Sequence, residues 1–309
     1  MRIVSLLPSA TEMVHALGLG HALVGVTHEC DFPPGVEELP HLTRTLLPEG
    51  ASSSEIDTLV RERLKTDGAL YRLDLEELSN LEPDLIVTQA LCDVCTVAES
   101  EVQASACSLP STPAILNLEP ENLAEVFDAL RQLGSVTGIA DHAEDVIGVL
   151  TERVNAVVSR SQTVRKRPKV ALLEWLDPPF SCGHWTPELV EIAGGIEGLG
   201  EAGQPSRTLD WVEVMAWKPE VIFIACCGFD LPRTLEEVSS LSSVSCWPEL
   251  PAVQSGRVYV TDGSQFFSRP GPRLVDSLEI LAHALHPDVH PLPPGLSQAL
   301  TQLSLLPSY

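Results

Sequence analysis

Residues 139–165 carry the longest uninterrupted helical pattern in the chain. They include no proline and a single glycine, Gly148, and their apolar residues recur at the spacing of one helix face. About seven turns would span roughly 40 Å, and the basic run 165–167 followed by Pro168 would end the helix. A rod of this length is typical of a stiff connection between two folding units, although a crossover helix within one large sheet is the alternative.

Both halves of the chain alternate short apolar runs with amphipathic stretches, which is the order of an α/β fold. The expected strands are 3–7, 23–27, 84–88, 114–118, 169–174, 221–225 and 257–261. The expected helices are 9–17, 53–65, 75–81, 96–107, 120–133, 187–193, 209–217, 235–241 and 272–285. We therefore predict two Rossmann-like α/β lobes over 1–137 and 168–286, a bridging helix over 138–167, and a proline-rich tail over 287–309.

The charge balance excludes two classes of partner. The chain has 19 Lys and Arg residues against 43 Asp and Glu residues, a formal charge of −24. Such a surface repels phosphate backbones, so we expect no nucleic-acid partner. No apolar run of about 18 residues is present, so we expect no membrane insertion. The acidity fits a soluble monomer, and an acidic face that docks on a basic partner is the other interpretation.

The start of the chain and its cysteines bear on the compartment. Met1 and Arg2 lead directly into the first expected strand without the apolar core of a secretory signal, which predicts a cytoplasmic protein. A periplasmic location would require that a signal had been removed. In a reducing compartment, cysteines are buried, catalytic or metal-binding rather than paired as disulfides. The eight cysteines are Cys30, Cys92, Cys95, Cys107, Cys182, Cys226, Cys227 and Cys246.

Distinctive side chains follow the expected strands. Ligands of parallel α/β sheets bind beyond the carboxyl ends of the strands, and these segments carry six of the eight cysteines, two histidines and several aromatic rings. Flat rings suit a large planar ligand, and thiolate or imidazole groups suit a transition metal. We predict a cleft between the lobes whose ligand-binding residues are Pro8, His28, Glu29, Gln89, Cys92, Trp175, Phe180, Cys182, His184, Cys227, Phe229, Phe266, Phe267 and Arg269.

The pair Cys92-x-x-Cys95 leaves alternatives open. Before a helix, such cysteines could act as a redox pair or bind metal, or they could be two small, semi-buried residues. Together with Cys30 they could form a zinc or iron site. A cysteine-dependent corrinoid or redox enzyme is therefore one alternative function, and a zinc- or iron-binding protein is another. The sequence contains neither a Walker loop nor a Gly-x-Ser-x-Gly elbow, and we do not expect an enzyme.

Several motifs, taken in order, resemble the class III substrate-binding proteins of the iron-siderophore and vitamin B12 ABC importers, and the vitamin B12-binding members most of all. These motifs lie at 2–12, 24–34, 75–86, 178–180, 193–195 and 268–273. The resemblance implies two lobes joined by a long helix, with cobalamin, a related corrinoid or a similar metal chelate bound between them. It also implies an ABC permease partner, onto which Glu99 and Glu197 would dock. Because the Glu29-Cys30 and Cys92-x-x-Cys95 features depart from those members, we expect a cytoplasmic branch of the family.

Overall fold

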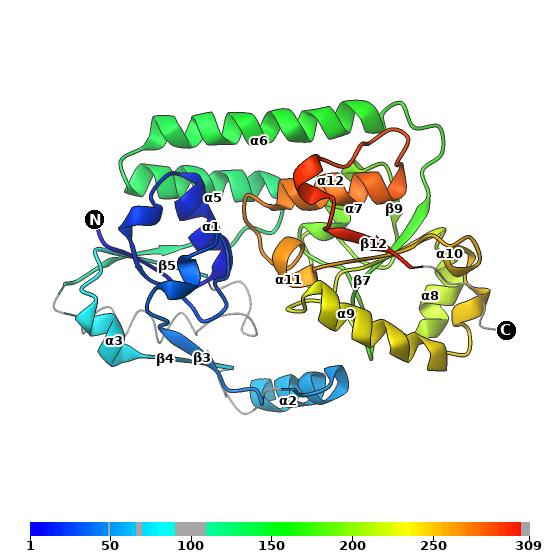
Figure 1. Ribbon diagram of the computed structural model, residues 1–309, viewed down its shortest axis with the longest axis horizontal. Helices are drawn as coiled ribbons and strands as arrows, with labels where there is room; N and C mark the ends of the chain where they lie inside the picture. The colour runs from blue at the N-terminus through cyan, green and yellow to red at the C-terminus, as the bar shows by residue number, and fades with distance from the viewer. Residues whose placement is uncertain (49, 66–69, 90–108, 110, 304–309) are drawn as a thin grey trace. The chain divides into compact units, whose positions relative to one another are not determined.

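The computed structural model describes residues 1–48, 50–65, 70–89, 109 and 111–303 (Figure 1). Its contacts divide the chain into two compact units. The N-terminal unit comprises residues 1–120 and 124–148, and the C-terminal unit comprises 121–123 and 149–309. Each unit combines a mainly parallel sheet with helices, as the alternating pattern predicted. That the two halves share one cleft concerns the placement of the units and stays a prediction.

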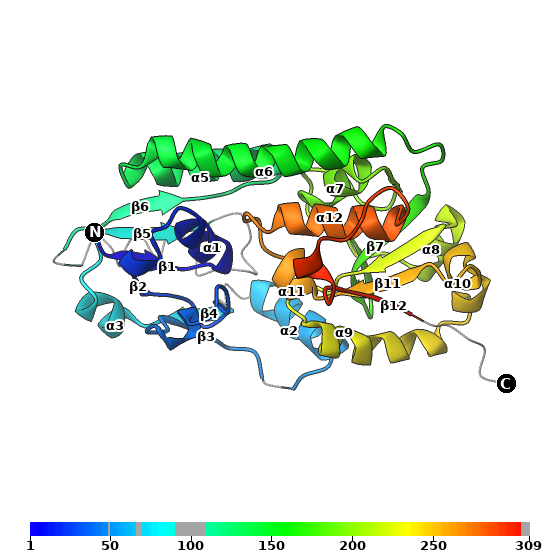
Figure 2. The same ribbon diagram turned by 45° about the horizontal axis from the view of Figure 1, so that its top comes forward.

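The N-terminal unit is built on four parallel strands in the order β2-β1-β5-β6. A two-stranded antiparallel sheet of β3 and β4 lies beside α3 (Figure 2). In the sequence, α2 lies between these two strands. The strands are β1 (Ile3–Ser5), β2 (Leu23–Gly25), β3 (Thr43–Thr45), β4 (Tyr71–Leu73), β5 (Leu85–Thr88) and β6 (Ala114–Asn117). The helices are α1 (Pro8–Ala16), η1 (Gly20–Ala22), η2 (Val36–Glu38), α2 (Ser53–Lys65), α3 (Leu75–Asn80) and α5 (Leu123–Val136), followed by α6 (Ala140–Ser161).

Successive side chains of a strand point to opposite faces of the sheet, so alternate residues of this unit pack into the same apolar layer. Val4 and Ile86 share one apolar cluster with Leu42 from the segment before β3, Leu73 from β4 and Leu78 from α3. These side chains are all at most 5% exposed, so burial of one sheet face holds the small β3–β4 sheet in place.

The C-terminal unit has a six-stranded sheet in the order β12-β11-β10-β7-β8, with β9 also pairing with β7. The strands are β7 (Lys169–Leu176), β8 (Pro179–Ser181), β9 (Ile196–Glu197), β10 (Val221–Ile224), β11 (Val258–Thr261) and β12 (Leu300–Gln302). The helices are α7 (Thr186–Ile192), α8 (Trp211–Trp217), α9 (Leu231–Val238), η3 (Ser239–Ser243), η4 (Trp247–Glu249), α10 (Pro251–Gln254), α11 (Gly263–Phe266), α12 (Leu274–Leu285) and η5 (Pro294–Leu296).

Helices cover both faces of this sheet, with α12 on one side and α9 on the other (Figures 1 and 2). Ala171, Ile222 and Val258 point to the α9 side, where they share a cluster with Val214 of α8 and Ala252 of α10. All five side chains are completely buried. A sheet covered on both faces explains why its strands read as continuous apolar runs rather than as alternating ones.

The predicted long helix exists but is shorter than expected. Helix α6 has 22 residues, about 33 Å at 1.5 Å per residue, and the boundary between the two units falls inside it. The prediction that the basic run 165–167 ends it was wrong, because the helix stops at Ser161. Lys166 instead pairs with Glu220, and Arg167 pairs with Glu191. Ion pairing to neighbouring elements thus replaces the predicted interaction with the helix dipole.

The remaining differences lie at element boundaries and in short strands. The helix expected at 235–241 begins earlier, at Leu231, because the Asp230 side chain caps it by accepting a hydrogen bond from the Arg233 N–H. The expected helix 96–107 lies outside the described residues. The C-terminal tail is not merely a surface segment: β12 pairs antiparallel with β11, and His290, 2% exposed, bonds to Ser161. Among the described helices, none combines the length and apolar character needed to cross a bilayer.

We predict that Arg153 stabilises the packing of α6 on α12 within the C-terminal unit. Its guanidinium donates to Asp276 at 2.5 Å and to Glu279 at 2.6 Å, and all three side chains are at most about a third exposed. Arg153→Ala should lower the free energy of unfolding by about 1–2 kcal/mol, between the values for exposed and fully buried pairs. Arg131→Ala, which removes more exposed pairs with Asp128 and Glu144, is the control and should cost about 0–1 kcal/mol in a urea titration. Equal losses would contradict the anchoring role.

Candidate functional site

Aromatic side chains gather at the carboxyl end of the C-terminal sheet. Trp175 on β7 pairs with Phe180 on β8, so the two side chains leave the same face of the sheet. The Trp175 ring also packs on that of Phe229, with centroids 4.8 Å apart and planes tilted by 40°. All three residues are partly exposed. We call Trp175, Phe180 and Phe229 the aromatic edge.

Cys227 adjoins the aromatic edge. It follows β10, it is exposed, and its backbone N–H donates to the carbonyl oxygen of Glu174 at 2.9 Å. Parallel pairing of β7 with β10 produces this neighbourhood, because it brings the ends of both strands to one side of the sheet. Four of the predicted ligand-binding residues therefore come together here, and they offer flat apolar faces beside a thiol.

A turn after β8 and a loop after β9 lie against the same end of the sheet, and their backbones touch. His184 N–H donates to Gln204 O at 2.7 Å, and Gly203 N–H donates back to His184 O at 2.9 Å. A Cβ on Gly200 would overlap the carbonyl oxygen of Cys182, and one on Gly183 would overlap the backbone at Ser206. Glycine is required at both positions because no side chain fits between the two segments.

Two glutamates hold these segments. Glu174 accepts a hydrogen bond from Gly183 N–H at 3.2 Å and one from the Ser206 hydroxyl. Burial raises the pKa of Glu174 to about 7, and the negative charge of Glu197 adds to this rise, whereas the bonds from Ser206 and Gly183 oppose it.

Glu197 has an internal role that does not suit the predicted permease docking. One carboxylate oxygen accepts hydrogen bonds from the N–H groups of Gly198, Leu199 and Gly200 at 3.0, 2.7 and 3.1 Å. Burial raises the pKa of this carboxyl group, and the three N–H bonds oppose the rise. The sequence could not show this, because the carboxylate folds back onto the loop that directly follows it.

Four other predicted ligand-binding residues are buried in the C-terminal unit. Cys182 is completely buried, and burial together with the charges of Glu197 and Glu174 raises the pKa of its thiol. Phe266 and Phe267 are 6% and 2% exposed, and the latter packs on Phe223. Arg269 is 7% exposed and bonds to Ser264. Short α11 begins directly after β11 and turns these aromatic residues inward, which alternation along a strand does not reveal.

His184 lies beside this layer rather than on the aromatic edge. Its backbone has a φ of 48°, in the left-handed region, and its ring stacks on Trp185 with centroids 5.5 Å apart. Burial lowers the pKa of its imidazole, and its Nδ1 is buried without a hydrogen-bond partner among the described residues. The ring is thus neutral at pH 7 and restrained by its backbone.

In the N-terminal unit, His28 and Glu29 follow β2 and remain partly or fully exposed. Nδ1 of His28 lies 2.7 Å from the hydroxyl oxygen of Thr43, and the Tyr71 ring packs 5.4 Å from the imidazole. Tyr71 donates a hydrogen bond to Glu29 at 2.8 Å. Burial lowers the pKa of His28, so the ring is neutral at pH 7. The β3–β4 sheet therefore fixes two of the predicted residues.

The other predicted residues of this unit are less accessible. Pro8 begins α1 and is partly exposed, whereas Gln89, after β5, is 6% exposed. Cys30, 3% exposed, lies 3.1 Å from the Thr11 hydroxyl. The predicted metal ligands Cys92 and Cys95 and the predicted docking residue Glu99 lie outside the described residues. Within the described part of the chain, no three His, Cys, Asp or Glu side chains are grouped so that they could hold a metal ion.

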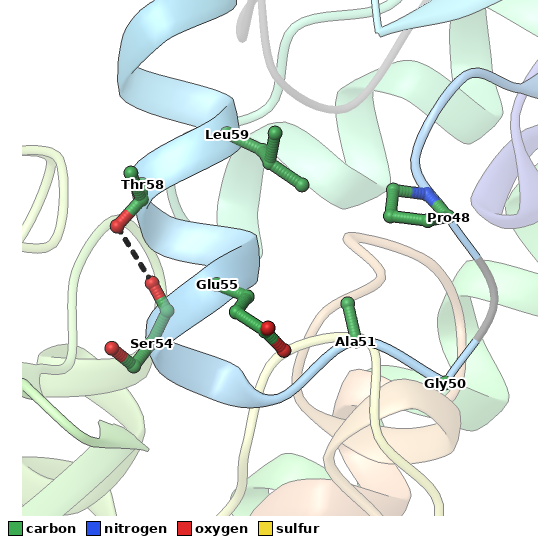
Figure 3. Close-up of a pocket in the computed structure, with 7 residues that line it drawn as sticks. All are labelled: Pro48, Gly50, Ala51, Ser54, Glu55, Thr58 and Leu59. Carbon is green, nitrogen blue, oxygen red and sulfur yellow. Dashed lines mark hydrogen bonds between the residues drawn. The ribbon is translucent and has the colours of Figure 1, made fainter.

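A hollow of about 540 Å³ also opens in the N-terminal unit, beside the first turns of α2 (Figure 3). Pro48 and Leu59 lie on opposite sides of it, and none of the predicted site residues that the structure describes lines it. Glu55 accepts hydrogen bonds from the Ser52 N–H and hydroxyl, which fills the anion-binding position at the start of α2. The described residues of the lining include neither an aromatic ring nor a cation, so the strand ends are the better candidate for the ligand site.

The sequence profile of the periplasmic binding protein family matches residues 3–264. The chain belongs to this family. A vitamin B12-binding protein of Vibrio cholerae is 23% identical over 282 residues, which cover 90% of this chain and 86% of the relative. An uncharacterized ABC transporter substrate-binding lipoprotein of Bacillus subtilis is 23% identical over 298 residues, 93% of this chain and 80% of the relative. A periplasmic heme binding protein from Pseudomonas aeruginosa has the same fold, with a TM-score of 0.70 at 20% identity over 96% of each chain.

Family membership confirms three predictions: the fold class, the substrate-binding family and a non-enzymatic role. It thereby removes the alternative of a cysteine-dependent enzyme. A small-molecule ligand follows from the same membership. The predicted cytoplasmic location finds no support among these relatives, which are described as periplasmic proteins or as a lipoprotein.

Four polar residues that organise these sites were not predicted from the sequence: Thr43, Tyr71, Glu174 and Ser206. Glu174 had a signal, because it is an acidic residue near the end of an otherwise apolar strand. Thr43 and Tyr71 act from strands of three residues, and Ser206 acts from a loop. Their partners are distant in sequence, so no local pattern marks them.

We predict that the contact between the turn and the loop tolerates no side chain at Gly200. Gly200→Ala should cost about 1–3 kcal/mol of unfolding free energy, the usual range for overpacking. Gly148→Ala is the matched control, since a Cβ there meets nothing within 4 Å, and relief of a helix-interior glycine should stabilise by about 0.5–1 kcal/mol. Thermal and urea unfolding measure both, and a Gly200→Ala variant as stable as the parent would contradict the close approach.

Proposed function

We propose that the protein binds a corrinoid, with cobalamin as the preferred ligand, or a similar metal chelate such as haem. The aromatic edge with its neighbouring thiol is the observation that carries this proposal. Flat rings bury the faces of a macrocycle well, and each can contribute roughly 1–3 kcal/mol to the binding of a planar ligand. Relatives in the same family are named for vitamin B12 and for haem, so the ligand class agrees with the chemistry of the edge.

Charge favours the corrinoid over haem. The predicted ligand-binding residues that the structure leaves accessible include Glu29 but no cation, because Arg269 is buried. Haem carries two carboxylates, which would need cationic partners, whereas the rim of a corrinoid carries neutral amides. Amide N–H groups can donate to carboxylate and carbonyl oxygens, which an acidic protein supplies.

His28 is the residue that we expect to reach the metal from the N-terminal unit. In the tautomer whose Nδ1–H donates to the Thr43 hydroxyl, Nε2 keeps a lone pair for a metal, and a second-shell bond of this kind is usual for metal-bound imidazole. Binding would exchange one ligand of the chelated metal: the Nε2–metal bond forms, and a bound water or hydroxide leaves. The low pKa of His28 keeps the imidazole neutral for this step.

Delivery to an ABC permease on the outer side of the cytoplasmic membrane completes the proposal. The lipoprotein relative is named as an ABC transporter substrate-binding protein, and the heme binding protein that shares this fold is named as periplasmic. Of the two predicted docking residues, Glu99 is the one retained, since the carboxylate of Glu197 turns inward.

Removal of an aromatic-edge ring should weaken binding of hydroxocobalamin. We expect micromolar or tighter binding by the parent protein in isothermal titration calorimetry. Trp175→Ala should raise Kd by at least about tenfold, or about 1.4 kcal/mol. Val212→Ala, a change at a 71% exposed residue of α8, is the control and should leave Kd unchanged. Absence of heat with the parent protein excludes the corrinoid, and preferential binding of haemin under the same conditions would replace it by haem.

Replacement of His28 should separate metal ligation from affinity. The visible bands of hydroxocobalamin should shift when the parent protein binds it, because imidazole replaces oxygen on cobalt. His28→Ala should still bind within about one order of magnitude yet lose the shift, since one ligand bond is a small share of the contact area. His21→Ala, at an exposed residue of the same unit, should keep it. A shift that survives in His28→Ala would rule out this ligand.

A further inference from the structure

Glu174 lies where the segments of the candidate site in the C-terminal unit meet. It directly precedes Trp175 of the aromatic edge, and its backbone carbonyl accepts from Cys227. Its two side-chain oxygens reach two other segments: one accepts from Gly183 in the turn after β8, and the other from Ser206 in the loop after β9. One residue thus touches β7, the end of β10, the turn and the loop.

The groups around this carboxyl carry like charge or none. Glu197 faces it from β9, Cys182 from the end of β8 and Cys226 from the end of β10, and burial raises the pKa of both thiols. Thr186 of α7 adds a hydroxyl, and Arg207, next to Ser206, is paired with Glu213. Because no cation compensates a charge on Glu174 within this described shell, the ionised form is destabilised by burial and by Glu197.

We propose that Glu174 is a positioning residue that fixes the turn 182–184 and the loop 198–206 beside the aromatic edge, and that it does so best when its carboxyl group is protonated. In the protonated form, Oε2–H donates to the Ser206 hydroxyl while Gly183 N–H donates to Oε1, so both bonds exist without a buried charge. Loss of the proton reverses the Ser206 bond and leaves two carboxylates in one enclosure. The ligand surface would then be coupled to pH. This inference rests on the proposed function for its link to binding, but not for its structural part.

The pKa of about 7 determines how the stability contributed by Glu174 changes with pH. An acid whose folded pKa is raised stabilises the fold fully below its unfolded value of 4.5 and loses that contribution as the pH rises through 7. Between pH 6 and pH 8 the carboxyl group changes from about nine-tenths protonated to about nine-tenths ionised. His28 and His184 titrate below their ordinary 6.5, so they do not account for a change centred near 7.

Hydrogen exchange of the ligand-free protein tests the structural part. After correction for intrinsic rates, amides of residues 198–206 should exchange at least about fivefold faster at pH 8 than at pH 6. The reason is that the loop opens more often when the Glu174 carboxyl group is ionised. Glu174→Gln should remove this difference, since the amide accepts from Gly183, donates to Ser206 and never ionises. Glu249→Gln, a change at an exposed acid of η4, is the control and should behave as the parent does. Equal exchange ratios in parent and Glu174→Gln would overturn the proposal.

Binding of hydroxocobalamin then tests the link to function. The parent should bind more weakly at pH 8 than at pH 6, by about threefold or more, relative to Glu174→Gln measured at the same two pH values. The ratio to the variant cancels any titration of the ligand itself. Parallel pH profiles of parent and variant would overturn the coupling. If the parent binds no chelate at either pH, the proposed function fails, and the exchange result alone decides the positioning role.

Discussion

Parallel pairing of β-strands is the constraint on which both sites depend. Each unit places its central strands side by side in the same direction, β1 with β5 and β7 with β10, so segments distant in sequence end at one edge. The aromatic edge exists because β7 and β10 end together, and an open parallel sheet offers its loops to a ligand at such an edge. The helices on both faces of the C-terminal sheet bury its apolar strands, so the side chains that a ligand can reach lie on these loops and strand ends.

The second constraint is the treatment of buried charge. This chain is strongly acidic, and its C-terminal unit places two carboxyl groups, those of Glu174 and Glu197, inside a shell of hydroxyls, thiols and backbone N–H groups. Both carboxyl groups accept hydrogen bonds, and neither is paired with a cation among the described residues, although Oε2 of Glu197 is buried there without a hydrogen-bond partner. Hydrogen bonds lower the cost of burying a carboxylate without removing its charge, so such a group stays responsive to protons. The same hydrogen bonds fix the backbones of Gly183 and Gly200. The charge of each carboxyl group therefore affects the conformation of the turn or loop that it binds.

Periodicity predicted the architecture well, because strands buried on both faces and the long helix α6 leave strong patterns. The short strands β3, β4, β8, β9 and β12 were missed, since two or three residues carry no period and owe their conformation to pairing partners. The structure brings some of the predicted ligand-binding residues together and buries others. Trp175 and Phe180 lie near the ends of β7 and β8, Cys227 and Phe229 follow β10, and all four are at least partly exposed. Phe266, Phe267 and Cys182 also follow strands, but α11 and the turn after β8 direct them into the core.

The C-terminal tail has a consequence for how the chain is made. Strand β12, formed by Leu300–Gln302, covers the outer edge of β11, and its neighbour Leu303 packs into the core cluster of the same unit. The N-terminal unit consists of residues no later than 148 and therefore leaves the ribosome first, as domains that fold during synthesis do. The C-terminal unit receives its outermost strand only after residues 300–302 have been synthesised, later than β7, β10 and β11. Until then one edge of β11 is unpaired and open to other nascent chains, so the order of synthesis gives this sheet a period in which it can aggregate.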